Sequence, residues 1–150
     1  MASDKPVVLI TGSEGRIGRA IAARLADAYT VVGLERECKG PDCINADITS
    51  EDELAAAFAT LRERYGARVA SVIHLAAFYD FSGEPNPMYE SVNVKGTQNL
   101  LRALQPFEVD QVIYASTMLV HAPSSPGHPI NETSPLAPAW PYPESKLATE

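Results

Sequence analysis

Short apolar runs alternate along this chain with stretches in which apolar residues recur every three or four positions. The runs occupy residues 7–10, 30–34, 43–46, 69–75 and 109–115. Runs of this length, most of them rich in β-branched residues, predict buried strands. The pattern therefore predicts five strands in chain order, joined by segments of a different periodicity.

The periodic stretches predict amphipathic helices, because residues at this spacing share one face of a helix. Ser50 and Glu53 form the capping-box pattern that begins one of them. Buried strands separated by helices predict an α/β fold, a doubly wound parallel sheet of the Rossmann type, in one domain over residues 1–150. Ligands of such sheets bind at the carboxyl ends of the strands, near the point where the strand order reverses. The apolar helical positions are Ile17, Ile21, Leu25, Leu54, Phe58, Leu61, Tyr65, Tyr89, Val92, Gly96, Leu100 and Leu104.

Residues 121–143 follow neither pattern. They hold seven of the twelve prolines of the chain and predict a long irregular loop. Loops of this length inside a domain are usually functional or mobile.

Composition narrows the range of partners. The chain is 45% hydrophobic and 21% charged, which is ordinary for a globular enzyme core. A net charge of −7 argues against nucleic acid or an anionic membrane surface as a partner. No apolar run reaches the roughly 18–20 residues of a membrane span, and residues 1–6 lack the features of an export signal. We therefore expect a cytoplasmic protein.

Cys38 and Cys43 are the two cysteines. They are too few for a disulfide framework, and without a second pair or a nearby histidine they make a poor zinc site. We expect free thiols and no bound metal.

A glycine-rich turn, residues 11–18, comes directly after the first predicted strand and opens a helix. Gly12 allows the tight turn, Gly15 lets a pyrophosphate approach the backbone, and Gly18 lets the helix pack closely. Free N–H groups at the helix start supply an anion site. The spacing is G-x-x-G-x-x-G, so it does not match the strict dinucleotide fingerprint. It does not match a Walker P-loop either, which argues against ATP hydrolysis.

Acidic residues follow the second and third strands. Glu35 can accept both ribose hydroxyls of NAD and would repel the 2′-phosphate of NADP. Arg36 beside it can instead pair with that phosphate or stack on adenine. Asp47, next to Ile48, can take the adenine amino group or belong to the cap ahead of Ser50. The balance favours NAD over NADP.

Six motifs in this order resemble the extended short-chain dehydrogenases/reductases, and within them the NAD-dependent epimerase/dehydratase branch. The resemblance covers essentially the whole chain. The motifs are residues 11–18, Asp47-Ile48, residues 74–77, residues 93–97, Ser116-Thr117 and Tyr142-x-x-x-Lys146.

The resemblance implies roles for further residues. Arg16 and Ile17 would hold the pyrophosphate from the glycine turn, and Asp47 and Ile48 would border the adenine. The segment after the fourth strand would line the middle of the cofactor, through Leu75, Ala76 and Ala77. Asn93 would support the active site from its helix.

Tyr142 and Lys146 form a candidate acid/base pair, because residues four apart lie on one face of a helix. A free tyrosine has a pKa near 10, and a nearby ammonium lowers it towards the working range. Tyr142 could then exchange a proton with a substrate hydroxyl or carbonyl oxygen. By the family pattern, Lys146 also binds the nicotinamide ribose. The pattern Tyr-x-x-x-Lys is common in proteins and alone would not indicate catalysis. Here it follows a glycine turn and a predicted fifth strand, and this combination favours a catalytic pair.

Two groups of side chains could complete the site. Thr117 could hold the substrate oxygen in line with Tyr142, with Ser116 as its neighbour, or the pair could cap local backbone. Phe78, Tyr79 and Phe81 either wall the substrate pocket or cover the sheet, and Trp140 is equally open.

These residues leave three functions. The first is an NAD-dependent epimerase or dehydratase acting on a small molecule, for which we expect a sugar nucleotide. The second is a simple dehydrogenase or reductase of another alcohol or carbonyl. The third is a non-catalytic dinucleotide sensor, which the presence of Thr117, Tyr142 and Lys146 disfavours. The family pattern also implies a C-terminal substrate lobe that this chain lacks and a homodimer packed through two helices. We therefore expect a cofactor-binding part cut within the catalytic helix, with weak activity alone.

Overall fold

Five parallel strands form the centre of the computed structural model, which describes residues 5–80 and 82–150. Their order across the sheet is β3-β2-β1-β5-β7. The chain runs outward from β1 to β3 and then returns to the other side of β1 at β5, so the strand order reverses between β1 and β5. The predicted doubly wound parallel sheet is confirmed. The strands are β1 (Val7–Thr11), β2 (Thr30–Glu35), β3 (Cys43–Asn45), β5 (Ser71–His74) and β7 (Val112–Tyr114).

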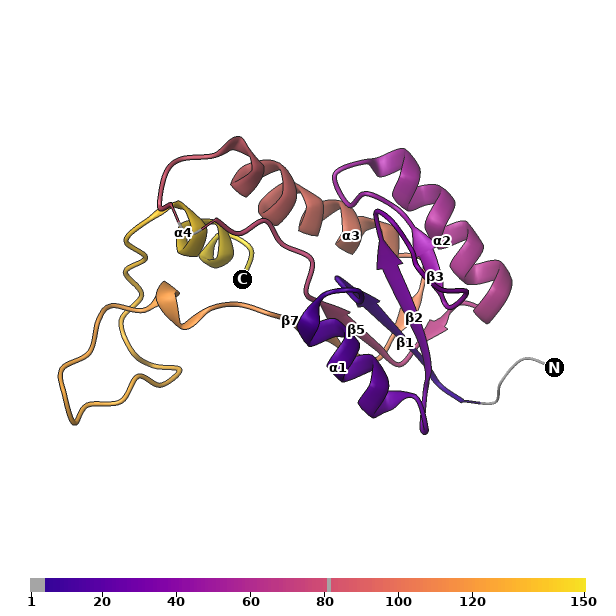
Figure 1. Ribbon diagram of the computed structural model, residues 1–150, viewed down its shortest axis with the longest axis horizontal. Coiled ribbons are helices and arrows are strands. Elements are labelled where there is room, and N and C mark those ends of the chain that lie inside the picture. Colours follow the sequence, from indigo (N-terminus) through magenta and orange to yellow (C-terminus); the bar gives the residue numbers. More distant parts are fainter. Residues whose placement is uncertain (1–4, 81) are drawn as a thin grey trace.

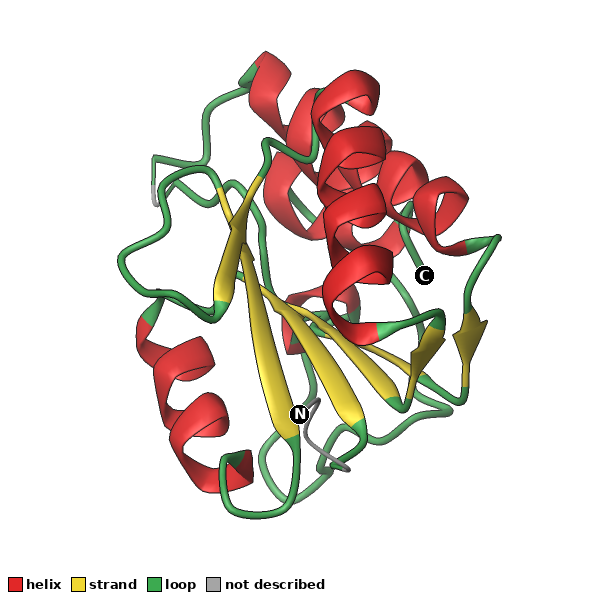
Figure 2. Cartoon of the chain, turned by 90° about the vertical axis from the view of Figure 1, so that its right-hand side faces the viewer, coloured by secondary structure: helices red, strands yellow, loops and turns green. Residues whose placement is uncertain are grey.

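Helices cover both faces of this sheet (Figure 1). On one face Val8, Ile10 and Ile73 pack against apolar side chains of α1, among them Ile21. On the other face a larger core joins the sheet to α2 and α3, seen from a second side in Figure 2. Because alternate residues of β1 point to opposite faces, this fully buried strand contributes side chains to both cores. The helices are α1 (Arg16–Leu25), α2 (Glu51–Tyr65), η1 (Tyr89–Gly96), α3 (Thr97–Leu104), η2 (Met118–Val120) and α4 (Pro141–Leu147).

Two predicted strands are each divided into two pieces. Residues 69–75 form the end of β4 (Arg68–Val69) and then β5, and residues 109–115 form the end of β6 (Glu108–Val109) and then β7. β4 and β6 pair with each other in a separate two-stranded parallel sheet. The polar pair Asp110-Gln111 marks the break between β6 and β7, whereas no polar residue separates β4 from β5.

The predicted helix over residues 89–104 is continuous but changes character along its length. Its first half, η1, has π-helical hydrogen bonding, and α3 continues it as an ordinary α-helix. Single π-helical turns inside helices often occur at functional sites. Here the wide turn contains Asn93, which the resemblance had assigned to the active site.

The expectation of free thiols is wrong. A disulfide links Cys38 to Cys43 across the connection between β2 and β3, with the two Cα atoms 5.6 Å apart. That separation lies in the ordinary range for a disulfide. Two cysteines are too few to indicate a framework, but five residues of sequence are enough to close one turn.

The start of α2 and the proline-rich segment follow the sequence pattern. The hydroxyl of Ser50 accepts a hydrogen bond from the backbone N–H of Glu53, as a capping box requires. The carboxylate of Glu53 departs from that motif, because it accepts from the N–H of Asp47. Residues 121–140 lack regular structure and project away from the sheet (Figure 1). Among the described residues, no helix is long and apolar enough to span a membrane.

Candidate active site

The glycine turn after β1 is shaped for close approach. Gly12 has φ +73°, and a Cβ atom there would lie 3.0 Å from the backbone nitrogen of Ala76. A Cβ atom on Gly18 would overlap the carbonyl oxygen of Gly12 and so open the turn. The loop therefore tolerates side chains at neither position. The missing side chains leave a bare cradle beside the start of α1, which fits a pyrophosphate.

A cavity of about 500 Å³ opens at the carboxyl ends of β1, β2, β3 and β5. This is the side of the sheet on which doubly wound folds bind ligands. It contains most of the residues predicted to bind the cofactor and brings them together from four separate strand ends. The predicted residues that line it are Gly12, Gly15, Glu35, Arg36, Asp47, Ile48, Leu75, Ala76 and Ala77.

Two carboxylates at this cavity have local partners. One oxygen of Glu35 accepts hydrogen bonds from the hydroxyl of Ser13, at 3.1 Å, and from the backbone N–H of Glu14, at 2.7 Å. Glu35 thus ties the end of β2 to the glycine turn. Asp47 accepts from the N–H and the hydroxyl of Thr49, at 2.9 and 2.8 Å. Asp47 therefore shapes the turn before α2, as the capping interpretation predicts, and it also lines the cavity. Its contact with the adenine amino group stays a prediction.

Several predicted cofactor residues lie beside the cavity without lining it. Arg16 and Ile17 are the first two residues of α1, within the glycine turn, and Ile17 is 65% exposed. Gly18 is buried within the turn. Asn93 and Ser116 also lie outside the cavity lining.

A chain of hydrogen bonds runs beneath the cavity through His74, which is 2% exposed. The hydroxyl oxygen of Thr11 accepts from the backbone N–H groups of Leu75 and Ala76, so its own proton must go to Nδ1 of His74, 2.6 Å away. Nε2 of His74 then carries the ring proton and donates to Thr97 Oγ1 at 2.8 Å. The network assigns one neutral tautomer to His74.

The same series of hydrogen bonds continues from His74 to α4. The hydroxyl of Thr97 donates to the backbone oxygen of Asn93 at 2.6 Å. The side-chain amide of Asn93 bonds both the N–H and the carbonyl of Phe78, and its NH₂ group also donates to the hydroxyl of Ser145 at 2.9 Å. Burial, together with the charge of Lys146, lowers the pKa of His74 to about 4. His74 is the structural histidine that its place on a buried strand predicts.

Lys146 lies deep in the molecule, with 2% of its surface exposed. Its ammonium sits 4.3 Å from the centre of the Tyr114 ring. Burial lowers the pKa of Lys146 to about 8, although the nearby carboxylate of Glu150 acts in the opposite direction. A buried cation held on an aromatic face is costly to keep without a functional role.

The ring of Tyr142 lies in an aromatic group rather than against Lys146. Its centre is 4.4 Å from that of Tyr79, 5.9 Å from Trp140 and 6.3 Å from Tyr89. Partial burial and the neighbouring Tyr79 and Tyr89 raise the pKa of Tyr142, where the spacing alone predicts a lowered value. The predicted four-residue spacing is present, and in this structure Tyr142 is a protonated acid at neutral pH.

The two hydroxyl groups after β7 have different partners. The hydroxyl oxygen of Thr117 accepts from the N–H of Leu119 at 3.3 Å and begins the short helix η2. The hydroxyl of Ser116 donates to the carboxylate of Glu150. The capping alternative therefore describes Thr117 here. Of the aromatic candidates, Tyr79 and Trp140 pack beside Tyr142, whereas Phe81 lies outside the described residues.

Sequence reasoning missed the residues that join these parts. Thr11 and Thr97 stand inside quoted motifs, and Ser145 stands between the predicted acid and base. Each is a buried residue with a hydroxyl group, at a strand end or on a helix. Their hydroxyl groups indicate that they can form hydrogen bonds. The sequence does not show with which residues, because their side-chain partners are 23 to 63 positions away.

Comparison with known proteins places this geometry in a family. The model of the NAD dependent epimerase/dehydratase family matches residues 8–150. The chain is 32% identical to 3 beta-hydroxysteroid dehydrogenase type 7 of Homo sapiens, covering 99% of this chain and 44% of that protein. It is 34% identical to L-arabinose 1-dehydrogenase (NAD(P)(+)) of Haloferax volcanii, over 76% of this chain and 42% of that protein. Among solved structures, the UDP-glucose 4-epimerase of Thermus thermophilus in complex with NAD superposes with a TM-score of 0.79 at 30% identity, covering 95% of this chain and 48% of that one. The chain thus spans less than half the length of these relatives.

Proposed function

Because this chain belongs to the NAD-dependent epimerase/dehydratase family, we propose that residues 1–150 are its NAD-binding Rossmann domain. The protein uses this domain to oxidise and reduce a carbon that bears a hydroxyl group, and the substrate class we favour is a sugar nucleotide. One observation carries the proposal. Most of the residues predicted to bind the dinucleotide converge from four strand ends on one cavity, beside a glycine turn whose Gly12 and Gly18 tolerate no side chain.

The residues of the chain divide the binding task. The glycine turn would hold the pyrophosphate through backbone N–H groups, with Arg16 and Ile17 at the start of α1. Glu35 would accept the ribose hydroxyls, and Asp47 and Ile48 would border the adenine. When bound, NAD supplies the acceptor and donor for the transferred hydride.

The proton is moved by the residues of α4. Tyr142 is protonated in this structure, so it is ready to give its proton to a carbonyl oxygen. Its reverse role, accepting a proton from a hydroxyl, requires a lower pKa, which the ammonium of Lys146 can supply only by approaching it. Thr117 would orient the substrate oxygen after releasing the N–H of Leu119.

A second candidate is a dehydrogenase with net turnover of the cofactor. It is favoured by the relatives at 32% and 34% identity, whose names state dehydrogenase activities. An epimerase returns the hydride to the same substrate, whereas a dehydrogenase accumulates NADH. Absorbance at 340 nm, followed with the full natural chain and a panel of sugar nucleotides, free sugars and sterols, separates the two. Steady NADH formation with an alcohol substrate would replace the epimerase proposal by the dehydrogenase one.

Cofactor choice is tested by calorimetric titration with NAD and NADP. The carboxylate of Glu35 makes charge-assisted hydrogen bonds, which are worth about 1.5–3 kcal/mol each. We expect Glu35→Gln to weaken NAD binding by about tenfold and to narrow the preference over NADP. Glu37→Gln is the matched control, because Glu37 lies exposed two residues further along the same loop. Equal effects of the two substitutions would contradict the role given to Glu35.

A further inference from the structure

The disulfide between Cys38 and Cys43 closes the loop that follows the residues proposed to select the cofactor. Cys38 comes three residues after Glu35, and Cys43 is the first residue of β3. Glu35 and Arg36 both line the cofactor cavity. The cross-link therefore joins the connection that follows β2 to the first residue of β3, next to the residues that line the cavity.

The hydrogen bonds of this loop are few. The N–H of Gly33 donates to the carbonyl of Asp42 at 2.8 Å, and the N–H of Cys38 donates to the side chain of Asn45 at 2.8 Å. Residues 36, 37 and 39–42 are all exposed, so they contribute little packing. Covalent closure is accordingly the strongest constraint on the position of this loop.

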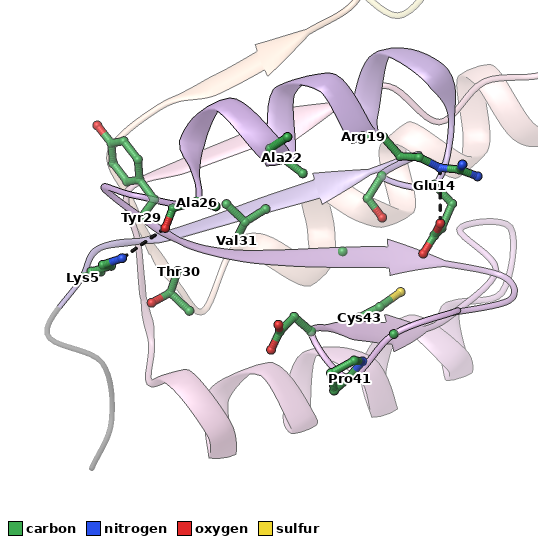
Figure 3. Close-up of a pocket in the computed structure, with 15 residues that line it drawn as sticks. Lys5, Glu14, Arg19, Ala22, Ala26, Tyr29, Thr30, Val31, Pro41 and Cys43 are labelled. Carbon is green, nitrogen blue, oxygen red and sulfur yellow. Dashed lines mark hydrogen bonds and ion pairs between the residues drawn. The ribbon is translucent and has the colours of Figure 1, made fainter.

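A second cavity gives access to the cross-link. It has a volume of about 550 Å³ and lies between α1 and the loop, with Cys43, Pro41 and Glu14 on its walls (Figure 3). The side chain of Glu14 pairs with Arg19 across this cavity at 3.6 Å, and the backbone N–H of Glu14 is the one that donates to Glu35. The same hollow thus borders the disulfide and the glycine turn.

We propose that Cys38 and Cys43 form a reversible thiol–disulfide site that sets the affinity of the protein for NAD. A dithiol reductant reaches Cys43 from the cavity, and one of its thiolates attacks the Cys43 sulfur. The Cys38–Cys43 bond breaks, Cys38 leaves as a thiolate and takes up a proton, and a mixed disulfide forms at Cys43. The second thiol of the reductant then attacks this mixed disulfide and releases Cys43. Two electrons and two protons pass to the protein, and the dithiol becomes a cyclic disulfide.

Reduction leaves the sheet and the glycine turn intact but frees residues 36–42. Glu35 stays in place, because it ends β2 and bonds the glycine turn, but Arg36 then occupies the binding geometry for only a fraction of the time, and the apparent affinity falls by that fraction. This inference rests on the proposed NAD site. With the loop ordered for a third to a tenth of the time, the Kd for NAD rises about threefold to tenfold. The turnover rate at saturating NAD stays unchanged, because Tyr142 and Lys146 lie on α4, at the opposite end of the chain.

The test is NAD titration of the full natural chain before and after treatment with dithiothreitol, with thiols counted by alkylation and intact mass. We expect no alkylation before treatment and two adducts after it, together with the loss of affinity. The double substitution Cys38→Ser with Cys43→Ser should bind NAD as weakly as the reduced protein and should not respond to dithiothreitol. Ser124→Ala, at an exposed position in the long loop, is a control that keeps the NAD affinity and the full redox response.

The outcomes separate this inference from the cofactor proposal. Equal NAD affinity in both redox states would overturn the redox site and leave the NAD site standing. Two free thiols in the protein as purified under air would also overturn it, whatever the affinity. Absence of NAD binding in both states would overturn this inference together with the proposed NAD site.

Discussion

The two ends of the candidate site are built differently. At the proposed adenosine end, Gly12, Glu35 and Asp47 stand at or just after the carboxyl ends of parallel strands, and all three line one cavity. At the catalytic end, Thr117 caps its own short helix and Tyr142 lies among aromatic rings. The segment between those two residues is largely irregular and exposed.

The difference shows what holds each end in place. Strand ends are fixed by the hydrogen bonds of the sheet and by two apolar cores, so the adenosine end needs no ligand to assemble it. The catalytic end is held by side-chain contacts of one short helix, through Asn93, Ser145 and Tyr114. We therefore expect substitutions at the adenosine end to alter binding and stability, and substitutions at the catalytic end to alter turnover. Four measurements can break or sharpen this division.

The largest effect is expected from Tyr142→Phe, which removes the proposed acid/base group and keeps the ring. General acid–base catalysis contributes about 10²–10⁴-fold, so kcat should fall on the order of a thousandfold. NAD affinity should stay within about twofold, since Tyr142 is separate from the cavity. Steady-state kinetics and calorimetry on the full natural chain measure the two quantities. Tyr29→Phe, beyond the far end of α1, is the control and should leave both unchanged.

The next effect is a pH dependence of stability from His74. Its pKa is about 4 in the folded protein and near 6.5 when unfolded, so folding favours the neutral ring. The contribution is complete above pH 6.5 and is lost as the pH falls towards 4. It amounts to about 3 kcal/mol in the free energy of unfolding.

Urea unfolding at several pH values tests this dependence. His74→Gln, which cannot titrate, should lose most of the slope between pH 6.5 and 4. His128→Gln should retain it, because His128 lies exposed in the long loop. A His74→Gln profile parallel to that of the unchanged protein would show that His74 is not the group responsible.

A smaller effect is expected from Gly12→Ala. The positive φ and the contact with Ala76 should lower the free energy of unfolding by about 2 kcal/mol and weaken NAD binding. Gly66→Ala is the matched control, because Gly66 has φ +86° with open space around it. It should cost about 1 kcal/mol and leave NAD binding unchanged. If the two substitutions weakened NAD binding equally, the glycine turn would not be the binding element.

The smallest effect concerns the stability of the catalytic end. Lys146 is buried with its ammonium against Tyr114, and burial lowers its pKa to about 8. Lys146→Met keeps the length of the chain and removes the charge, so the free energy of unfolding should rise by about 1 kcal/mol while turnover falls. Lys95→Met is a control at an exposed lysine of η1. A loss of stability in Lys146→Met would show that the buried ammonium holds α4 in place.

The parallel strands and the candidate residues at their carboxyl ends could be predicted because both follow from local pattern. Apolar runs identify buried strands, and a glycine turn after the first strand identifies the anion site, so Gly12, Glu35 and Asp47 could be placed without coordinates. The break at Ala70 could not be predicted, since this residue continues the apolar run, whereas the polar pair Asp110-Gln111 does mark the break in the other run. The disulfide was also missed, because two cysteines give no framework signal.

By itself the sequence determined the parallel sheet, the family and the chemical character of the candidate residues, because these depend on periodicity and on motifs shorter than ten residues. Only the tertiary structure decided which residues meet. It showed His74 linking Thr11 to Thr97, Asn93 linking Phe78 to Ser145, and Lys146 resting on Tyr114. It also reversed the expected direction of the Tyr142 pKa. The physical reason is that hydrogen bonds and desolvation act between groups brought together by the fold, and separation along the chain does not encode them.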